Sequence, residues 1–174
     1  MAATQVIVLN GGSSSGKTTI AQRLEELLPD DWLRLSIDNL VDALPVEGAG
    51  IGFGELGEVE VGERFRELEA AWMSGVAAMA RVGARVILDD VFLGGAASQE
   101  RTRARLEGLS VLWVGVRCDP AVAAAREAAR GDRITGMAAT QAVAVHEGVA
   151  YDVEVDTSDL GPDECARAIA AHLT

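Results

Sequence analysis

The sequence predicts one α/β domain with three layers, in which helices cover both faces of a five-stranded parallel sheet. Short apolar segments alternate with helical ones along the chain, and this order favours parallel strands joined by helical crossovers. The length of 174 residues suits one domain. A hydrophobic content of 49% and a charged content of 24% are typical of a soluble globular protein.

Five short apolar runs are the predicted strands, because they are continuous and rich in branched residues, as strands buried on both faces are. They cover residues 6–9, 32–37, 84–92, 110–117 and 152–156. Helices are predicted over residues 17–28, 40–44, 63–81, 99–106, 120–130, 137–146 and 163–173. Residues 46–62 hold six glycines without a helical period, so we expect a loop that can contain a small hairpin.

The charge and the cysteine content restrict the partners of the chain. A net charge of −12 argues against a nucleic-acid partner, because phosphate backbones select basic surfaces. No apolar run reaches the roughly 20 residues of a membrane helix, and the N-terminus lacks the pattern of a signal peptide. Cys118 and Cys165 have no metal-binding spacing, which favours reduced thiols and a cytoplasmic location. The sequence leaves open whether the chain forms a homo-oligomer.

The clearest motif is GGSSSGKT at residues 11–18, which matches G-x4-G-K-[ST] between a predicted strand and a predicted helix. Small residues are needed because backbone N–H groups curl around phosphate oxygens at the positive end of the following helix. The motif predicts a P-loop NTPase fold that binds ATP. Lys17 is expected to reach the β- and γ-phosphates as a catalytic group, and Thr18 to ligate Mg²⁺. The expected ATP-binding residues of the loop are Gly11, Gly12, Ser13, Ser14, Ser15, Gly16, Lys17, Thr18 and Thr19.

Other features favour a small kinase similar to the nucleoside monophosphate kinases. The sequence has no Asn-Lys-x-Asp motif of a GTPase, and motor or AAA proteins need a longer chain. Asp38 follows a predicted strand and opens a helix, so its carboxylate can bind the acceptor and take the proton of the attacking hydroxyl. The alternative is that Asp38 only caps a helix beginning at Asn39. The P-loop one strand away favours the catalytic role.

Two adjacent carboxylates end the third predicted strand. Asp89 follows an apolar run, as the metal-binding aspartate of P-loop enzymes does, and is expected to hold Mg²⁺. Asp90 is expected to contact the acceptor. Burying both carboxylates is costly unless a metal or hydrogen-bond donors compensate, which argues against a purely structural role. Which of the two serves the metal stays open.

Three arginines gather in the segment AREAARGDRITG of this acidic chain. Arg126 and Arg130 share one helical face, and Arg133 follows a Gly-Asp turn. Cationic groups are needed where charge redistributes on the transferred phosphoryl, so we expect residues 126–140 to form a lid. In it Arg126 and Arg130 bind the nucleotide and Arg133 acts catalytically. The alternative is an exposed helix whose arginines pair with Glu127 and its neighbours.

The acceptor is expected to lie against the glycine-rich segment 45–62. Phe53 and Trp72 could flank an aromatic acceptor, although core packing is the usual role of a tryptophan. Residues 1–174 therefore form a single predicted kinase domain, with the lid and this loop beside its site.

Longer strings of residues resemble a known family. They are VLNGGSSSGKT, SIDNLVDALP, ILDDVFLGGAASQER, VLWVGVRCD, AREAARGDRITGMAATQA and HEGVAYDVEVDT. Together they resemble the chloramphenicol phosphotransferases of antibiotic-producing actinomycetes, over roughly residues 6–157. The resemblance implies an ATP-dependent kinase that phosphorylates the primary hydroxyl of chloramphenicol and so inactivates it. It also implies that Asp38 is the catalytic aspartate, that residues 11–18 bind ATP, and that the lid arginines lie within residues 126–133.

The chain departs from this family at residues 46–60, which are shorter and richer in glycine than expected. Because this segment is predicted to wall the acceptor site, a kinase for another hydroxylated small molecule or a nucleoside stays an alternative. A second alternative is an ATP-binding regulatory protein that acts through a partner. The combination of Asp38, Asp89 and the arginine cluster favours the enzyme.

Overall fold

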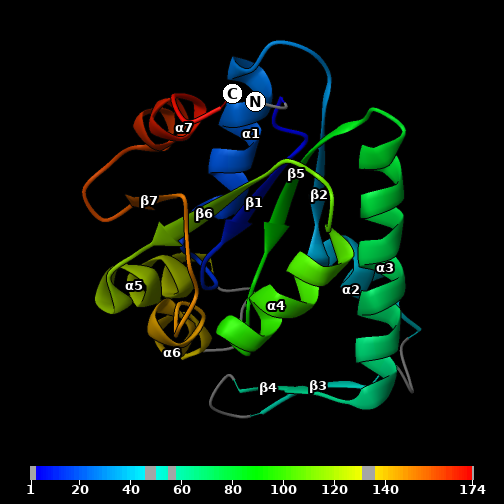
Figure 1. Cartoon of the computed structure of the whole chain (residues 1–174). Helices are drawn as coiled ribbons and strands as arrows, with labels where there is room; N and C mark the ends of the chain where they lie inside the picture. The colour runs from blue at the N-terminus through cyan, green and yellow to red at the C-terminus, as the bar shows by residue number, and fades with distance from the viewer. Residues whose placement is uncertain (1–2, 46–49, 55–57, 131–135, 174) are drawn as a thin grey trace.

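Figure 1 shows the computed structural model of the chain, which describes residues 3–45, 50–54, 58–130 and 136–173. Five strands form the main sheet, and all of them pair in parallel in the order β2-β5-β1-β6-β7. They are β1 (Val6–Asn10), β2 (Trp32–Ser36), β5 (Arg85–Asp90), β6 (Val111–Arg117) and β7 (Val153–Asp156). The P-loop therefore leaves the central strand of the sheet.

Helices cover both faces of this sheet. One face packs against α1 (Lys17–Leu27) and α7 (Pro162–Ala170), and the other against α3 (Glu63–Arg81) and the end of α4 (Ala96–Arg105) (Figure 1). The side chains of β1 alternate, with Ile7 and Leu9 in the first core and Val6 and Val8 in the second. All four are fully buried, and each such burial contributes about 1.5–3 kcal/mol.

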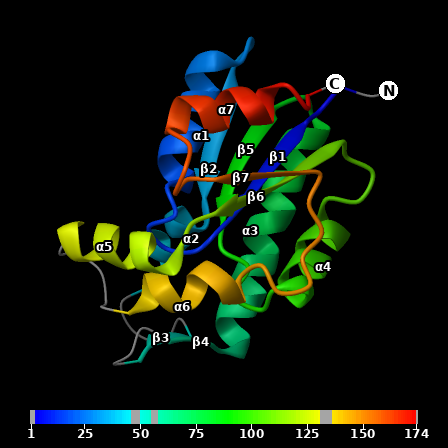
Figure 2. The same ribbon diagram turned by 90° about the vertical axis from the view of Figure 1, so that its left-hand side faces the viewer.

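The remaining elements gather at the carboxyl ends of the strands, as the two views agree (Figures 1 and 2). They are α2 (Ile37–Ala43), the antiparallel hairpin of β3 (Ile51–Phe53) and β4 (Val59–Val61), α5 (Pro120–Arg130) and α6 (Met137–Ala144). Ligands of open parallel sheets bind at this edge. Any site built on the P-loop is thus enclosed by these short elements.

The structure confirms the predicted five-stranded parallel sheet and its helical layers. It places α3 and α5 at the predicted bounds and finds the hairpin within residues 46–62. Two helices begin three residues earlier than predicted, α2 at Ile37 and α4 at Ala96. The early start of α2 has a local cause, since Ser36 caps the helix with its side chain. None of the helices in the described ranges combines the length and apolar character needed to span a membrane.

Candidate active site

The loop between β1 and α1 has backbone features that only small residues allow. Gly16 has a φ of 90°, a left-handed conformation that glycine adopts without strain. Gly12 is needed for a different reason: a Cβ atom there would lie 2.9 Å from the backbone carbonyl carbon of Gln141 on α6. The loop is therefore shaped by its own turn on one side and by the close approach of α6 on the other.

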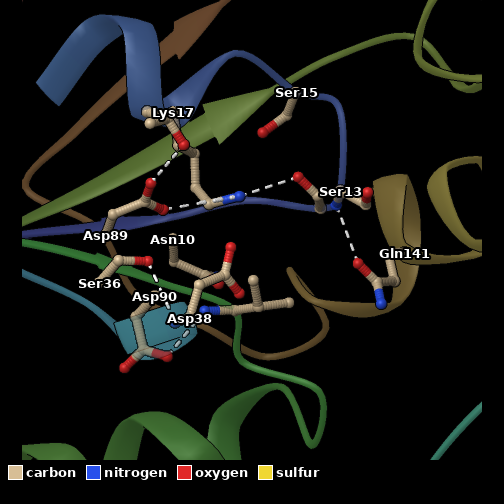
Figure 3. A network of polar contacts seen from close by, with 12 residues as sticks. Asn10, Ser13, Ser15, Lys17, Ser36, Asp38, Asp89, Asp90 and Gln141 are labelled. Atoms are coloured by element: carbon tan, nitrogen blue, oxygen red, sulfur yellow. Dashed lines mark hydrogen bonds and ion pairs between the residues drawn. The ribbon is translucent and has the colours of Figure 1, made fainter. Parts of the chain in front are cut away.

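The cationic and hydroxyl groups of the loop meet the end of β5. Thr18 Oγ1 donates a hydrogen bond of 2.7 Å to Asp89 Oδ2, and Lys17 Nζ lies 3.8 Å from Asp89 Oδ1 (Figure 3). Lys17 Nζ also donates to the carbonyl oxygen of Gly12 at 2.9 Å. Lys17 and Asp89 are both buried. The sheet register, which sets Leu9 of β1 beside Asp89 of β5, brings these groups together.

The side chains of the loop fit a phosphate and its metal ion. The hydroxyls of Ser13, Ser14 and Ser15 are buried and have no hydrogen-bond partner among the described residues. Hydroxyl and carboxylate oxygens, as on Thr18 and Asp89, are the ligands that Mg²⁺ prefers. In the described ranges no group of three or more His, Cys, Asp or Glu side chains could hold a metal ion. A Mg²⁺ ion between Thr18 and Asp89 would therefore share its coordination with phosphate oxygens and water.

A cavity of about 590 Å³ opens over the loop. One end is formed by the loop and the other by the hairpin and the first turns of α3, with α2, α4 and α6 as side walls. Its lining includes residues 13–19 and Asp89 at the phosphate end, and Val41, Ile51, Val59, Val61 and Phe65 at the far end. The far end thus offers apolar surface to a second molecule.

Asp38 lies between these two ends. Its carboxylate lines the cavity together with Ser36 and Asp42. The N-cap of α2 is Ser36, whose Oγ accepts the Asp38 N–H at 3.2 Å, while Asn39 Oδ1 accepts the Ser36 N–H at 2.9 Å. The alternative in which Asp38 caps a helix beginning at Asn39 is therefore wrong. Ser36 supplies the cap, and Asp38 lines the cavity.

Asp90 differs from its neighbour Asp89. Asp90 does not line the cavity and is 6% exposed, and its carboxylate accepts the Val91 N–H at 2.7 Å. Burial raises the pKa of Asp90 from 3.8 to about 7, and the negative charges of Glu69 and Asp89 act in the same direction. The structure thus places Asp90 behind the cavity wall and away from the expected acceptor.

The substitution Asp90→Asn is expected to stabilise the protein at high pH. Between about pH 4 and pH 7 the unfolded carboxyl has lost a proton that the folded one keeps, so wild-type stability falls as the pH rises. Asparagine keeps the acceptor for Val91 N–H and does not titrate. At pH 8 we expect the free energy of unfolding of the variant to exceed that of the wild type by up to about 4 kcal/mol. At pH 4 we expect the two proteins to have the same free energy of unfolding. Urea unfolding of the wild type and the variant between pH 4 and pH 8 measures this difference in the free energy of unfolding. A difference that does not change with pH would contradict the prediction.

The structure gives Arg126 and Arg130 of the predicted lid different positions. Arg130 lines the cavity at the end of α5. The Arg126 guanidinium instead bonds to Thr157, donating to its Oγ1 at 3.0 Å and its carbonyl oxygen at 2.8 Å, and it does not line the cavity. Thr157 Oγ1 in turn donates to the Ser15 carbonyl at 2.8 Å, so Arg126 supports the loop from behind. Arg133 lies outside the described residues.

Glu127 and Gln141 are two site-forming residues that the sequence did not reveal as such. The alternative to the lid paired Glu127 with arginines, but Glu127 is buried and accepts hydrogen bonds of 2.8 Å from Gly136 N–H and Ala138 N–H. It therefore ties α5 to the start of α6. Gln141 Oε1 accepts the Ser13 N–H at 2.8 Å (Figure 3). Neither role has a sequence signal, because both depend on how α6 packs.

The aromatic residues expected at the acceptor have different positions. Trp72 does not line the cavity but packs beside the core on the α3 face, with its indole Nε1 buried and without a partner among the described residues. Phe53 belongs to β3, but its side chain lies outside the described part of the structure. Phe65 of α3, which is buried, lines the cavity instead.

The chain is similar to known proteins over most of its length. Residues 4–174 match the model of a family described as chloramphenicol phosphotransferase-like protein. The Mycobacterium tuberculosis protein named "Putative O-phosphotransferase Rv2636" is 30% identical over 189 residues, which cover 95% of this chain and 80% of that protein.

Solved structures share the fold at lower identity. The tunicamycin resistance protein of Deinococcus radiodurans superposes with a TM-score of 0.71 at 22% identity, covering 98% of this chain and 97% of that one. Shikimate kinase from Acinetobacter baumannii, solved in complex with shikimate, superposes with a TM-score of 0.63 at 18% identity, covering 96% and 91%.

Proposed function

The chain belongs to the chloramphenicol phosphotransferase-like family of P-loop phosphotransferases, and on this premise we propose that it moves the γ-phosphoryl of ATP to an alcohol. The proposal rests on one observation: the phosphate-binding groups and Asp38 line the same cavity. Lys17, Thr18 and Asp89 line its phosphate end, and Asp38 faces the same space from α2. An acceptor against the hairpin would therefore meet both the phosphates and a carboxylate.

Each of these groups has a role in the transfer. Asp38 orients the attacking hydroxyl and takes its proton as the new oxygen–phosphorus bond forms and the bond to the ADP oxygen breaks. Lys17 stabilises the charge on the phosphate oxygens, and Arg130 is placed to do the same from α5. Thr18 and Asp89 would hold Mg²⁺ together with ATP, and the ion would neutralise further phosphate charge.

We propose the primary hydroxyl of chloramphenicol as the first acceptor to test. The family match supports it, and so does the apolar far end of the cavity, where Ile51, Val59 and Phe65 can contact an aromatic ring. Charged side chains also line this end, among them Asp42, Arg66 and Glu69. They favour a test of polar, hydroxylated acceptors beside chloramphenicol.

The deciding measurement is ADP release from Mg·ATP with and without each acceptor. The panel contains chloramphenicol, shikimate, tunicamycin and a mixture of nucleosides, and Asp38→Asn is the matched inactive control. Stimulation by one acceptor that disappears in the variant supports the transfer and identifies the acceptor. If no acceptor stimulates ADP release and ATP still binds tightly, chloramphenicol is not the acceptor, and the nucleotide-binding regulator becomes the favoured alternative to a kinase for another alcohol.

A further inference from the structure

One peptide group of the P-loop is held from both sides. The carbonyl oxygen of Gly12 accepts a hydrogen bond from Lys17 Nζ at 2.9 Å. The N–H of the same peptide belongs to Ser13 and donates to Gln141 Oε1 at 2.8 Å (Figure 3). The Lys17 ammonium is the group that reaches the β- and γ-phosphates of a P-loop, so the peptide to which it is bonded lies beside the place of those phosphates. Gln141 thus lies at the γ-phosphate end.

Gln141 is a buried residue of the site and not a surface residue. It is 7% exposed and lines the cavity. Its helix is fixed at two points: Glu127 accepts the N–H groups of Gly136 and Ala138 at the start of α6, and Gly12 allows the Gln141 backbone to pack on the loop. The side chain therefore has little freedom to leave the loop.

The hydrogen bond to Ser13 also decides which way the carboxamide faces. The Ser13 N–H is a donor, so the atom turned to it must be the acceptor Oε1 and the Nε2 amino group must face away. Nε2 has no hydrogen-bond partner among the described residues, and it is not one of their buried unpaired atoms. Gln141 thus presents a neutral double donor, its Nε2 amino group, beside the expected γ-phosphoryl.

We propose that Gln141 is a phosphoryl-binding residue that makes the site distinguish ATP from ADP. Its Oε1 keeps the carboxamide in place on Ser13 N–H, and its Nε2 donates to an oxygen of the γ-phosphoryl. A neutral donor suits this place, because Lys17 and Arg130 already line the cavity as cations. The inference rests on the proposed use of ATP as the phosphoryl donor, but its test needs no acceptor.

The test compares two nucleotides that differ only at the γ position. Dissociation constants of Mg·ADP and of Mg·AMP-PNP are measured by calorimetry for the wild type and for Gln141→Met, which keeps the side-chain length but has no donor or acceptor. We expect the AMP-PNP constant to rise about 10- to 100-fold, the value of a lost hydrogen bond to a charged group, and the ADP constant to change less than about threefold. Thermal unfolding without nucleotide shows that the variant is folded.

Two further variants make the result specific. Gln141→Glu keeps an acceptor for Ser13 N–H and puts a negative charge at the γ end, so it too should weaken AMP-PNP selectively. Val143→Ala changes an exposed position of the same helix, 60% accessible to solvent, and should alter neither constant. If the ratio of the two constants in either Gln141 variant equals that of the wild type, the inference is wrong. A wild type that binds neither nucleotide would overturn both the proposed function and this inference.

Discussion

The substitution Asp38→Asn is expected to lower kcat about 1,000-fold, with ATP binding unchanged within about threefold. Asparagine has the size of aspartate and can still accept a hydrogen bond from the acceptor hydroxyl, but it cannot take the proton. The fold should not change, because Ser36 and not Asp38 caps α2, and the Asp38 N–H keeps its bond to Ser36. Acceptor-dependent ADP release measures kcat, and calorimetry with Mg·AMP-PNP measures nucleotide binding.

Asp42→Asn is the matched control for this variant. Asp42 lies one turn further along α2 and lines the same cavity, so the substitution removes the same charge from another position of the same helix. We expect kcat of this variant to stay within about fivefold of the wild type. Equal losses in both variants would mean that Asp38 acts only through the general charge of the cavity. A loss below tenfold in Asp38→Asn would remove its role as the base.

The parts of the site that sequence analysis predicts well are those that lie next to each other in the chain. The loop of residues 11–18 contains its phosphate-binding glycines, its lysine and its metal-binding threonine in one motif, and the strand before it and the helix after it are local signals. Asp38 and Asp89 follow from a rule about strand ends, because parallel strands end at one edge of the sheet. These expectations need no knowledge of side-chain packing.

The parts that sequence analysis does not resolve depend on how α5 and α6 meet the loop. Arg126 and Arg130 look equivalent at a spacing of four residues, yet Arg126 binds Thr157 and only Arg130 lines the cavity. Gln141 has no motif, and its contact to Ser13 joins residues 128 positions apart. Asp89 and Asp90 are adjacent, but their side chains lie on opposite faces of the sheet because side chains alternate along a β-strand. Asp89 therefore contacts Thr18, whereas Asp90 is buried and does not line the cavity.

Asp89→Asn is expected to lower ADP release about 100- to 1,000-fold at millimolar Mg²⁺. The asparagine oxygen can still accept the Thr18 hydroxyl, so the geometry between α1 and β5 should survive. The lost charge is the one that attracts the metal, and a neutral amide oxygen binds Mg²⁺ more weakly than a carboxylate. The concentration of Mg²⁺ for half-maximal ADP release should therefore rise at least about tenfold.

A comparison with Asp90→Asn shows whether Asp89 acts as a metal ligand or only as a negative charge near the metal. Both substitutions remove one charge from the end of β5, but only Asp89 contacts Thr18 and lines the cavity. We expect Asp90→Asn to leave the Mg²⁺ requirement within about twofold and to alter only the pH dependence of stability. ADP release from both variants is titrated with Mg²⁺ at pH 8, where Asp90 is ionised in the wild type. This measurement decides between a ligand role and a charge effect of Asp89. Equal shifts would mean that the metal responds to the summed charge of the pair, whereas a shift in Asp89→Asn alone identifies the ligand.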